Sequence, residues 1–246
     1  MIRSFFVRAL DVWQDAFRLF WLAPIIPLIA IVPEFIQHVV EVQIGMFESR
    51  DAAIALANDP TRWAFGYAKL AGYLIAILLT IRFFAARRAG QKWWSASGLA
   101  WRVLAIAFAA NVAISAALAG VEFLLEGAPD ITKQIITLAV TIATMPFLVW
   151  LVAGLVGDKA ASIVQLYRTG WLAALRIVVF SAMVLLPLMW LHGANHDWAF
   201  GAASPIAWSL MVFDSLLVGL LAAAWGAAIH HGYIKLTEST DRVTAE

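Results

Sequence analysis

Five ionisable side chains interrupt long apolar stretches of this sequence, where charged groups are costly and mark functional sites by default. Asp214 is the deepest, because it stands nine residues inside its apolar stretch, or roughly 13 Å along a helix. Glu34, His38, Lys69 and Glu122 lie nearer the ends of three other stretches. Glu34 and Lys69 have similar depths in neighbouring stretches, so we expect an ion pair between them, with Asp214 competing for the same lysine.

Two interpretations of these five side chains stay open. In the first, they form structural ion pairs, and Lys69 and Glu122 extend their charged ends to the membrane interface. In the second, they line a polar pocket that opens outward and ends near Asp214. Asp214, Glu34 and His38 are also residue types that perform acid–base catalysis, but that chemistry requires mutual distances that a sequence does not give.

A histidine pair is the one candidate for metal binding. His192 and His196 are four residues apart and Asp197 follows them, a spacing that brings two imidazoles to one ion if the segment is helical. Gly193 and Asn195 instead predict a polar loop over residues 192–204, and no third ligand is evident. The absence of cysteine excludes thiolate metal sites and disulfides. We therefore predict no bound metal and no cofactor.

The composition indicates an integral membrane protein. The chain has 246 residues, of which 63% are hydrophobic and 13% charged, whereas soluble domains are about half apolar and a quarter charged. Little sequence remains for a soluble catalytic domain, and phosphate loops, nucleophile elbows and zinc-protease motifs are absent. We expect a protein that is not an enzyme and does not bind nucleic acid.

Six apolar segments are long enough to cross roughly 30 Å of hydrocarbon as helices. Since only helices and closed barrels satisfy their backbone in lipid, and the alternation of barrel strands is missing, the predicted fold is an all-α bundle forming one membrane domain over residues 1–246. The predicted spans are residues 19–40, 63–86, 99–125, 131–156, 173–191 and 205–230, followed by a polar tail at 235–246.

The positions of the basic residues predict the orientation of these spans. With a cytoplasmic N-terminus, 13 Lys and Arg residues fall on the cytoplasmic side and 4 on the other side. Cytoplasmic loops of membrane proteins carry such an excess of positive charge. We expect both termini in the cytoplasm and a multi-pass protein of a bacterial-type inner membrane.

Three amphipathic segments precede the odd-numbered spans, at residues 1–18, 88–102 and 159–172. Each has basic residues opposite aromatic and aliphatic ones at helical spacing, which predicts interfacial helices and three parallel hairpins. Their basic and aromatic side chains are expected to anchor the chain at the inner interface. The predicted anchors are Arg8, Arg18, Arg88, Lys92, Arg102, Lys159, Arg168, Arg176, Trp13, Trp93 and Trp171.

The run GDKAASIVQLYRTGWLAALRIVVFSAMVLLPL, at residues 157–188, resembles a pattern in bacterial six-span proteins. These are the membrane domains fused to glycerophosphodiester phosphodiesterases, together with their stand-alone relatives. The resemblance implies a helical bundle of re-used hairpins. It implies no catalysis, because the phosphodiesterase chemistry of that family lies in a separate soluble domain.

Two functions are expected from these observations. The first is a non-catalytic membrane protein that binds lipids or a protein partner. The alternative is a small-solute or ion transporter or channel that uses the outward-facing polar pocket near Asp214. Small residues in the last span, including Gly219 and Gly226, favour close helix packing and leave a homo-oligomer open.

Overall fold

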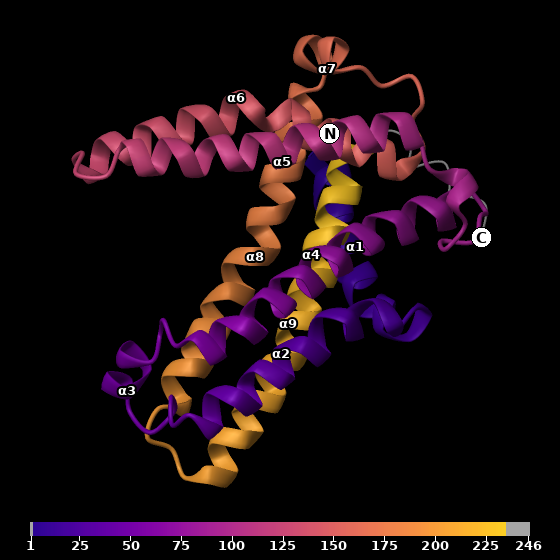
Figure 1. The fold of residues 1–246 in the computed structure, drawn as a ribbon. Coiled ribbons are helices and arrows are strands. Elements are labelled where there is room, and N and C mark those ends of the chain that lie inside the picture. Colours follow the sequence, from indigo (N-terminus) through magenta and orange to yellow (C-terminus); the bar gives the residue numbers. More distant parts are fainter. Residues whose placement is uncertain (1, 235–246) are drawn as a thin grey trace. The chain divides into compact units, whose positions relative to one another are not determined.

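The computed structural model describes residues 2–234, which are helical and contain no strand. Six helices are long and apolar enough to cross a membrane, so an all-α, multi-pass membrane protein is indicated (Figure 1). The predicted tail at 235–246 lies outside the described residues. The elements are α1 (Ile2–Leu22), α2 (Ile25–Gln43), α3 (Arg50–Ala55), α4 (Pro60–Arg88), η1 (Ala96–Gly98), α5 (Trp101–Leu124), α6 (Asp130–Val156), α7 (Ile163–Thr169), α8 (Trp171–Ala199) and α9 (Ser204–Tyr233). The six candidate spans are α2, α4, α5, α6, α8 and α9.

The first predicted span, residues 19–40, begins too early. Residues 19–22 belong to α1, and α2 begins at Ile25, directly after Pro24. Proline has no N–H for a helical hydrogen bond and restricts the residue before it, so the chain breaks here although its apolar character continues. The span itself is α2, and it extends to Gln43.

The fifth predicted span, residues 173–191, ends too early, and the polar loop expected at 192–204 is mostly helix. α8 continues through Ala199. The amide of Asn195, which predicted a loop, is buried and donates hydrogen bonds to Leu210 O at 2.9 Å and to Asp214 at 3.2 Å. A buried partner on α9 thus outweighs the weak helix propensity of this segment.

The predicted interfacial helices have different outcomes. Residues 2–18 of the first segment lie within α1, and residues 163–169 of the third segment form α7, with Ser162 as its N-cap. The second segment, 88–102, is not a helix: α4 ends at Arg88, and only the short η1 follows before α5. Arg82 donates hydrogen bonds to the carbonyls of Ser95 and Gly98, both at 3.1 Å, which holds this segment in an irregular conformation.

The arrangement of α1 also corrects the expected role of Arg8. This predicted anchor is 1% exposed and shares a buried face with Val12 and Leu19, whereas Leu10 and Phe17 are exposed. The buried face of α1 is therefore mostly apolar and carries Arg8, while Arg18 and several large apolar side chains are exposed. An apolar outer face is the arrangement that lipid favours.

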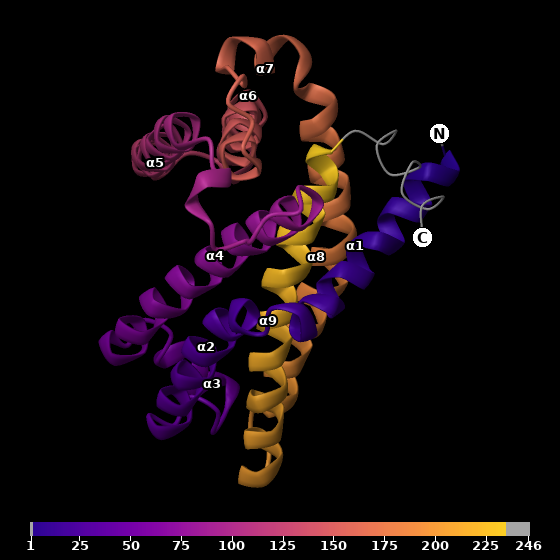
Figure 2. The ribbon, with the colours of Figure 1, turned by 90° about the vertical axis from the view of Figure 1, so that its right-hand side faces the viewer.

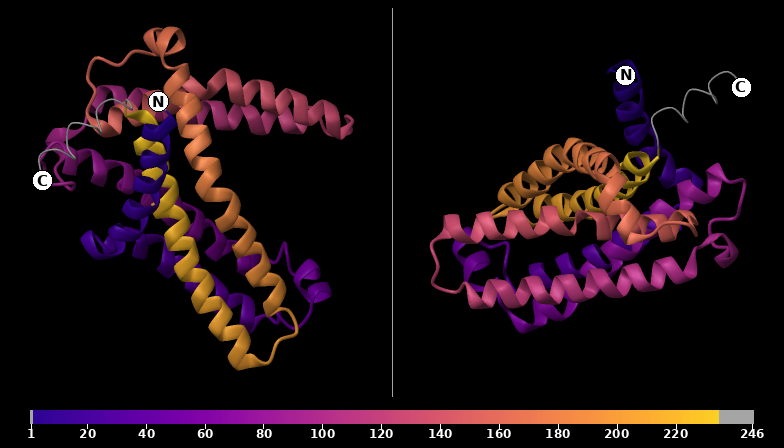
Figure 3. Two further views of the ribbon diagram at one scale, coloured as in Figure 1. Left: turned by 180° about the vertical axis from the view of Figure 1, so that it is seen from behind. Right: turned by 90° about the horizontal axis from the view of Figure 1, so that it is seen from above.

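The helices divide into two compact units. Unit 1 contains residues 1–80 and 179–231, and unit 2 contains residues 81–178 and 232–246. In unit 1, α2 and α4 pack beside α9, and α8 runs next to α9 as a hairpin (Figures 2 and 3). Glycines permit this close packing: a Cβ on Gly219 would lie 2.5 Å from Ile31, and one on Gly226 would lie 2.5 Å from Thr80. These contacts confirm the predicted packing role of the small residues.

Unit 2 is built on the α5–α6 hairpin, whose helices lie side by side (Figures 1 and 3). Gly154 brings the two backbones together, because a Cβ at this position would meet Leu104 Cα at 2.6 Å. Asn111 of α5 donates a hydrogen bond to Phe147 O of α6 at 3.0 Å. On α5, Val103 and Ala107 are the buried residues, and most of this helix is exposed.

Candidate functional site

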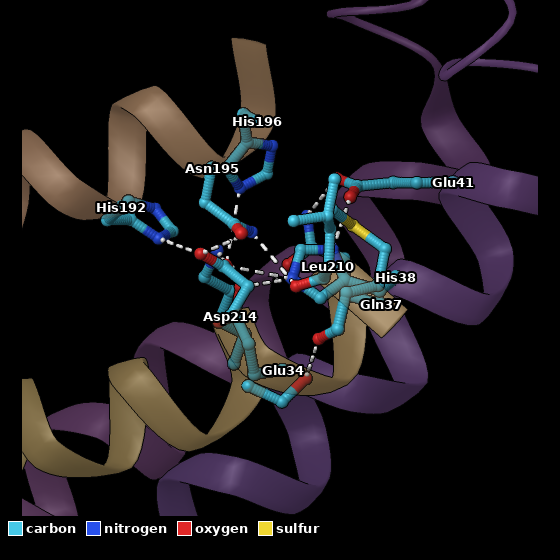
Figure 4. A network of polar contacts seen from close by, with 12 residues as sticks. Glu34, Gln37, His38, Glu41, His192, Asn195, His196, Leu210 and Asp214 are labelled. Atoms are coloured by element: carbon cyan, nitrogen blue, oxygen red, sulfur yellow. Dashed lines mark hydrogen bonds and ion pairs between the residues drawn. The ribbon is translucent and has the colours of Figure 1, made fainter. Parts of the chain in front are cut away.

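Polar side chains of unit 1 gather where α2 and α8 end and where α4 and α9 begin (Figure 4). We call this group the polar cluster. Each of its residues lies less than three helical turns from one of these helix ends. The connections from α2 to α4 and from α8 to α9 lie just beyond them. Its members are Glu34, Gln37, His38, Glu41, Arg62, Lys69, His192, Asn195, His196 and Asp214.

Asp214 of α9 lies at the centre of the polar cluster and is fully buried. Its Oδ1 contacts His192 Nδ1 at 2.9 Å and accepts a hydrogen bond from Asn195 at 3.2 Å. Its Oδ2 lies 3.0 Å from His38 Nε2 and 3.3 Å from His196 Nε2. Three imidazoles from two other helices therefore converge on one carboxylate.

His38 is surrounded by three carboxylates. Besides Asp214, its Nε2 lies 3.2 Å from Glu34 Oε1, and its Nδ1 lies 2.9 Å from Glu41 Oε2. A neutral imidazole has one donor nitrogen and one acceptor nitrogen, and carboxylates only accept. Contacts at both nitrogens therefore require a second proton on the ring, a proton on one of the carboxyl groups, or a cation that shares Nε2 with the carboxylates.

The two glutamates have cationic partners on α4. Lys69 Nζ lies 2.8 Å from Glu34 Oε1, so the expected Glu34–Lys69 ion pair is present. Arg62 Nε donates to Glu41 Oε1 at 2.9 Å. Asp59, whose side chain accepts from the N–H groups at the start of α4, sets where this helix begins and so where Arg62 stands.

Burial falls from the centre of the polar cluster to its rim. The side chains of Asp214 and Glu34 are 0% exposed, whereas those of Lys69 and His196 are each 25% exposed. Phe47, from the loop after α2, packs its ring 5.8 Å from His196 and 6.2 Å from His38. Its carbonyl accepts a hydrogen bond from Gly201 N, which joins the α2–α3 and α8–α9 loops over the cluster.

Four of the five predicted pocket residues meet in the polar cluster: Glu34, His38, Lys69 and Asp214. The fifth, Glu122, is exposed near the end of α5 in unit 2. The expected competition for Lys69 is not observed among the described residues, because Lys69 pairs with Glu34 and Asp214 contacts histidines instead.

Sequence reasoning named no role for four members of the polar cluster, which are Gln37, Glu41, Arg62 and Asn195. Glu41 and Arg62 lie in the connection between the first two predicted spans, and Asn195 lies in the predicted loop. His192 and His196 were considered only as a metal-binding pair.

The predicted interfacial anchors are mostly exposed. Arg176 is partly buried and donates to Gly232 O at 2.9 Å, which makes it a helix-to-helix contact within unit 2. Trp13, Trp93 and Arg88 are also partly buried. The exposed anchors are Arg18, Lys92, Arg102, Lys159, Arg168 and Trp171.

Comparison with known proteins gives no relative. No protein-family model, curated protein or solved structure matches this chain. Any function must therefore be argued from the polar cluster and its surroundings.

Proposed function

We propose that this chain is a cation transporter or channel of a bacterial-type inner membrane, with Asp214 in its binding site. The observation that carries this proposal is the convergence of three imidazoles on one buried carboxylate inside apolar helices. A structural ion pair requires one partner for each charge. Buried ionisable groups in excess of that requirement are typical of ion pathways.

The balance of charge in the polar cluster supports binding of a cation. Glu34 pairs with Lys69, and Glu41 pairs with Arg62. Asp214 has imidazole and amide partners, none of which carries a permanent charge. With neutral imidazoles the cluster keeps one uncompensated negative charge, and in a low-dielectric interior either a bound cation or a second proton on His38 would compensate it.

The place of the polar cluster in the spans supports access from one side of the membrane. With both termini in the cytoplasm, as the excess of basic residues there favours, the cluster opens toward the outer side. His196 stands three residues before the end of α8, about 5 Å along the helix. In this proposal the partly exposed His192 and His196 receive the cation before it reaches Asp214.

Flux through proteoliposomes tests this function. The full chain is reconstituted, and uptake of Na⁺, K⁺ and Zn²⁺ is measured, with proton movement followed by a pH-sensitive dye in the same vesicles. We expect flux of at least one cation, and we expect Asp214→Asn to reduce it to the level of empty vesicles. Asp197→Asn is the matched control, since Asp197 is an exposed aspartate of unit 1 that pairs with Arg50. Equal flux in the wild type and Asp214→Asn would refute the proposal.

A second candidate function, binding of lipids or a protein partner without catalysis, is favoured by unit 2. Most of α5 is exposed, and both helices of the hairpin have exposed large apolar side chains, among them Phe108, Val112, Leu138 and Ile142. Such a surface needs a lipid or protein cover. This candidate function is also the one that fits two expectations from the sequence. They are the resemblance to the membrane domains of glycerophosphodiester phosphodiesterases and the threefold hairpin repeat. Photo-crosslinking from position 112 in native membranes tests it, with a specific protein adduct or a defined lipid adduct as the expected result.

A further inference from the structure

Three ligand-type atoms of the polar cluster meet at one point. One ligand atom from each of His38, His196 and Asp214 lies within 4.8 Å of the other two, and Nε2 of both histidines contacts Asp214 Oδ2. Two of the separations are 3.0 Å and 3.3 Å. Atoms that bind one tetrahedral zinc ion at about 2.1 Å lie roughly 3.4 Å apart, so the 3.3 Å separation matches zinc coordination and the 3.0 Å separation is about 0.4 Å shorter.

The groups behind these atoms are those that orient metal ligands. A histidine ligand commonly donates its other N–H to a carboxylate, and His38 Nδ1 lies 2.9 Å from Glu41 Oε2. Glu41 is itself held by Gln37 at 3.0 Å and by Arg62. Each of these contacts keeps Nε2 of His38 aimed at Asp214.

Asp214 is supported in the same way. Its Oδ1 is occupied by His192 and Asn195 at 2.9 Å and 3.2 Å, which leaves Oδ2 directed at the two other imidazoles. His192 and His196 are one turn apart on α8, so a single helix supplies both a ligand and a group that orients a ligand.

His196 provides an independent indication. Its Nε2 is buried, and among residues 2–234 it lies 3.3 Å from Asp214 Oδ2 without the geometry of a hydrogen bond. A buried nitrogen without a hydrogen bond is unfavourable, whereas the lone pair of a neutral imidazole is a good metal ligand.

We propose that His38, His196 and Asp214 bind a divalent transition-metal ion such as Zn²⁺. The proposal rests on the proposed cation function and names the class of cation. Two imidazoles and a carboxylate match the ligand sets of zinc and of Fe(II) or Mn(II), while Mg²⁺ and Ca²⁺ prefer oxygen ligands alone. A dication also compensates the negative charge centred on Asp214.

Three protein ligands leave one position of a tetrahedral ion open. Glu34 Oε1 lies 3.2 Å from His38 Nε2, beside that position, and is paired with Lys69. We assign the open position to water or to Glu34, which provides a step by which a mobile ion exchanges ligands.

Equilibrium binding tests the metal site directly. The full chain, carrying no polyhistidine tag, is purified in detergent, treated with a chelator, and dialysed against Zn²⁺ with excess Mg²⁺ before elemental analysis. We expect one Zn²⁺ per chain and at least a 100-fold preference over Mg²⁺. Co²⁺ in place of Zn²⁺ should give a visible absorption spectrum of a low-coordinate site. The proposal would be overturned if the chain bound no more Zn²⁺ than Mg²⁺.

Single substitutions test the ligand assignment. His196→Gln is expected to weaken zinc binding by more than 100-fold, and His192→Gln, which removes an orienting group, by about tenfold. His231→Gln is the control, because His231 pairs with Asp15 outside the polar cluster. Elution volume and helix content of the His196→Gln chain are compared with the wild type, so that a loss of zinc binding is assigned to the ligand and not to unfolding. Wild-type zinc affinity in His196→Gln would refute the assignment.

Binding and flux separate the two proposals. Zinc binding without flux of any cation would retain the site and reject transport. Flux of Na⁺, K⁺ or protons without zinc binding would retain transport and reject the metal site.

Discussion

The two units place polar groups in apolar helices in opposite ways. In unit 1, charged and imidazole side chains of four helices meet in a buried network around Asp214 and His38. In unit 2, α5 and α6 meet through the close approach of Gly154 to Leu104 and through one neutral amide, Asn111. Helices of similar apolar character thus form a polar interior in one unit and a close-packed contact in the other.

This difference indicates where selection acts on chemistry and where it acts on packing. Helices that associate in lipid need only small residues and a few neutral hydrogen bonds, and unit 2 uses these. A network of charges adds little stability relative to apolar packing and becomes costly when one partner is lost. Unit 1 keeps such a network, which argues for a function that requires it.

The largest predicted effect is that of Asp214→Leu in unit 1. The substitution leaves His38, His192 and His196 facing an apolar side chain, and breaking a buried ionic network costs about 3–5 kcal/mol. We expect the free energy of unfolding, measured by titration with SDS from mild detergent micelles, to fall by this amount. Asp197→Leu, at an exposed position, should leave it nearly unchanged. A loss below about 1 kcal/mol for Asp214→Leu would mean that the network is solvated.

The next largest difference in stability is expected between Gly226→Ala in unit 1 and Gly120→Ala in unit 2. Gly226→Ala places a Cβ 2.5 Å from Thr80 Cβ, and overpacking of this kind costs about 1–3 kcal/mol. Gly120→Ala, in α5 of unit 2, has no atom within 4 Å of the new Cβ among the described residues. Since alanine has the higher helix propensity, the same unfolding titration should give an unchanged or increased stability for Gly120→Ala. An equal loss in the free energy of unfolding for both variants would show that the two units do not differ in how closely their helices pack at these glycines.

Asn111→Leu tests how much a neutral hydrogen bond contributes to unit 2. The amide donates to Phe147 O across the hairpin, and hydrogen bonds between membrane helices average about 0.6 kcal/mol. We expect a loss of that size in the SDS titration, far below the loss for Asp214→Leu. A loss of several kcal/mol would show that unit 2 also depends on a polar interior.

The smallest effect is expected for Arg50→Ala. Arg50 pairs with Asp197 at the surface, where both side chains are more than half exposed, and such pairs contribute about 0.2–1 kcal/mol. Cation flux should stay at the wild-type level, because neither residue belongs to the polar cluster. Loss of flux in Arg50→Ala with normal stability would extend the functional site to the outer loops.

Much of the fold follows from hydropathy. The predicted spans 63–86, 99–125 and 131–156 agree with α4, α5 and α6 within three residues at each end, because the length of an apolar run is set by the membrane. The two errors arose where local propensity and tertiary contacts disagree. Pro24 breaks an apolar run, and buried Asn195 continues a helix through residues that favour a loop.

The polar cluster was predictable only in part. The cost of burying charge identified Glu34, Lys69 and Asp214, because that cost does not depend on the partner. The meeting of His38 with Asp214, which are 176 residues apart, depends on the packing of α2 against α9. Nothing in the local sequence of either helix encodes that contact.

The order in which the chain is synthesised gives the ion pairs on α4 a further consequence. α2 is made long before α9, so Glu34 and Glu41 enter the membrane when Asp214 and the α8 histidines do not yet exist. Lys69 and Arg62 arrive on the very next span and can neutralise both glutamates at once. The first hairpin is thus electrically complete by itself, and the last hairpin brings its own histidines to Asp214. Of the contacts that Asp214 makes in the polar cluster, the one with His38 joins it to the first hairpin, so this contact forms only after α9 has been synthesised.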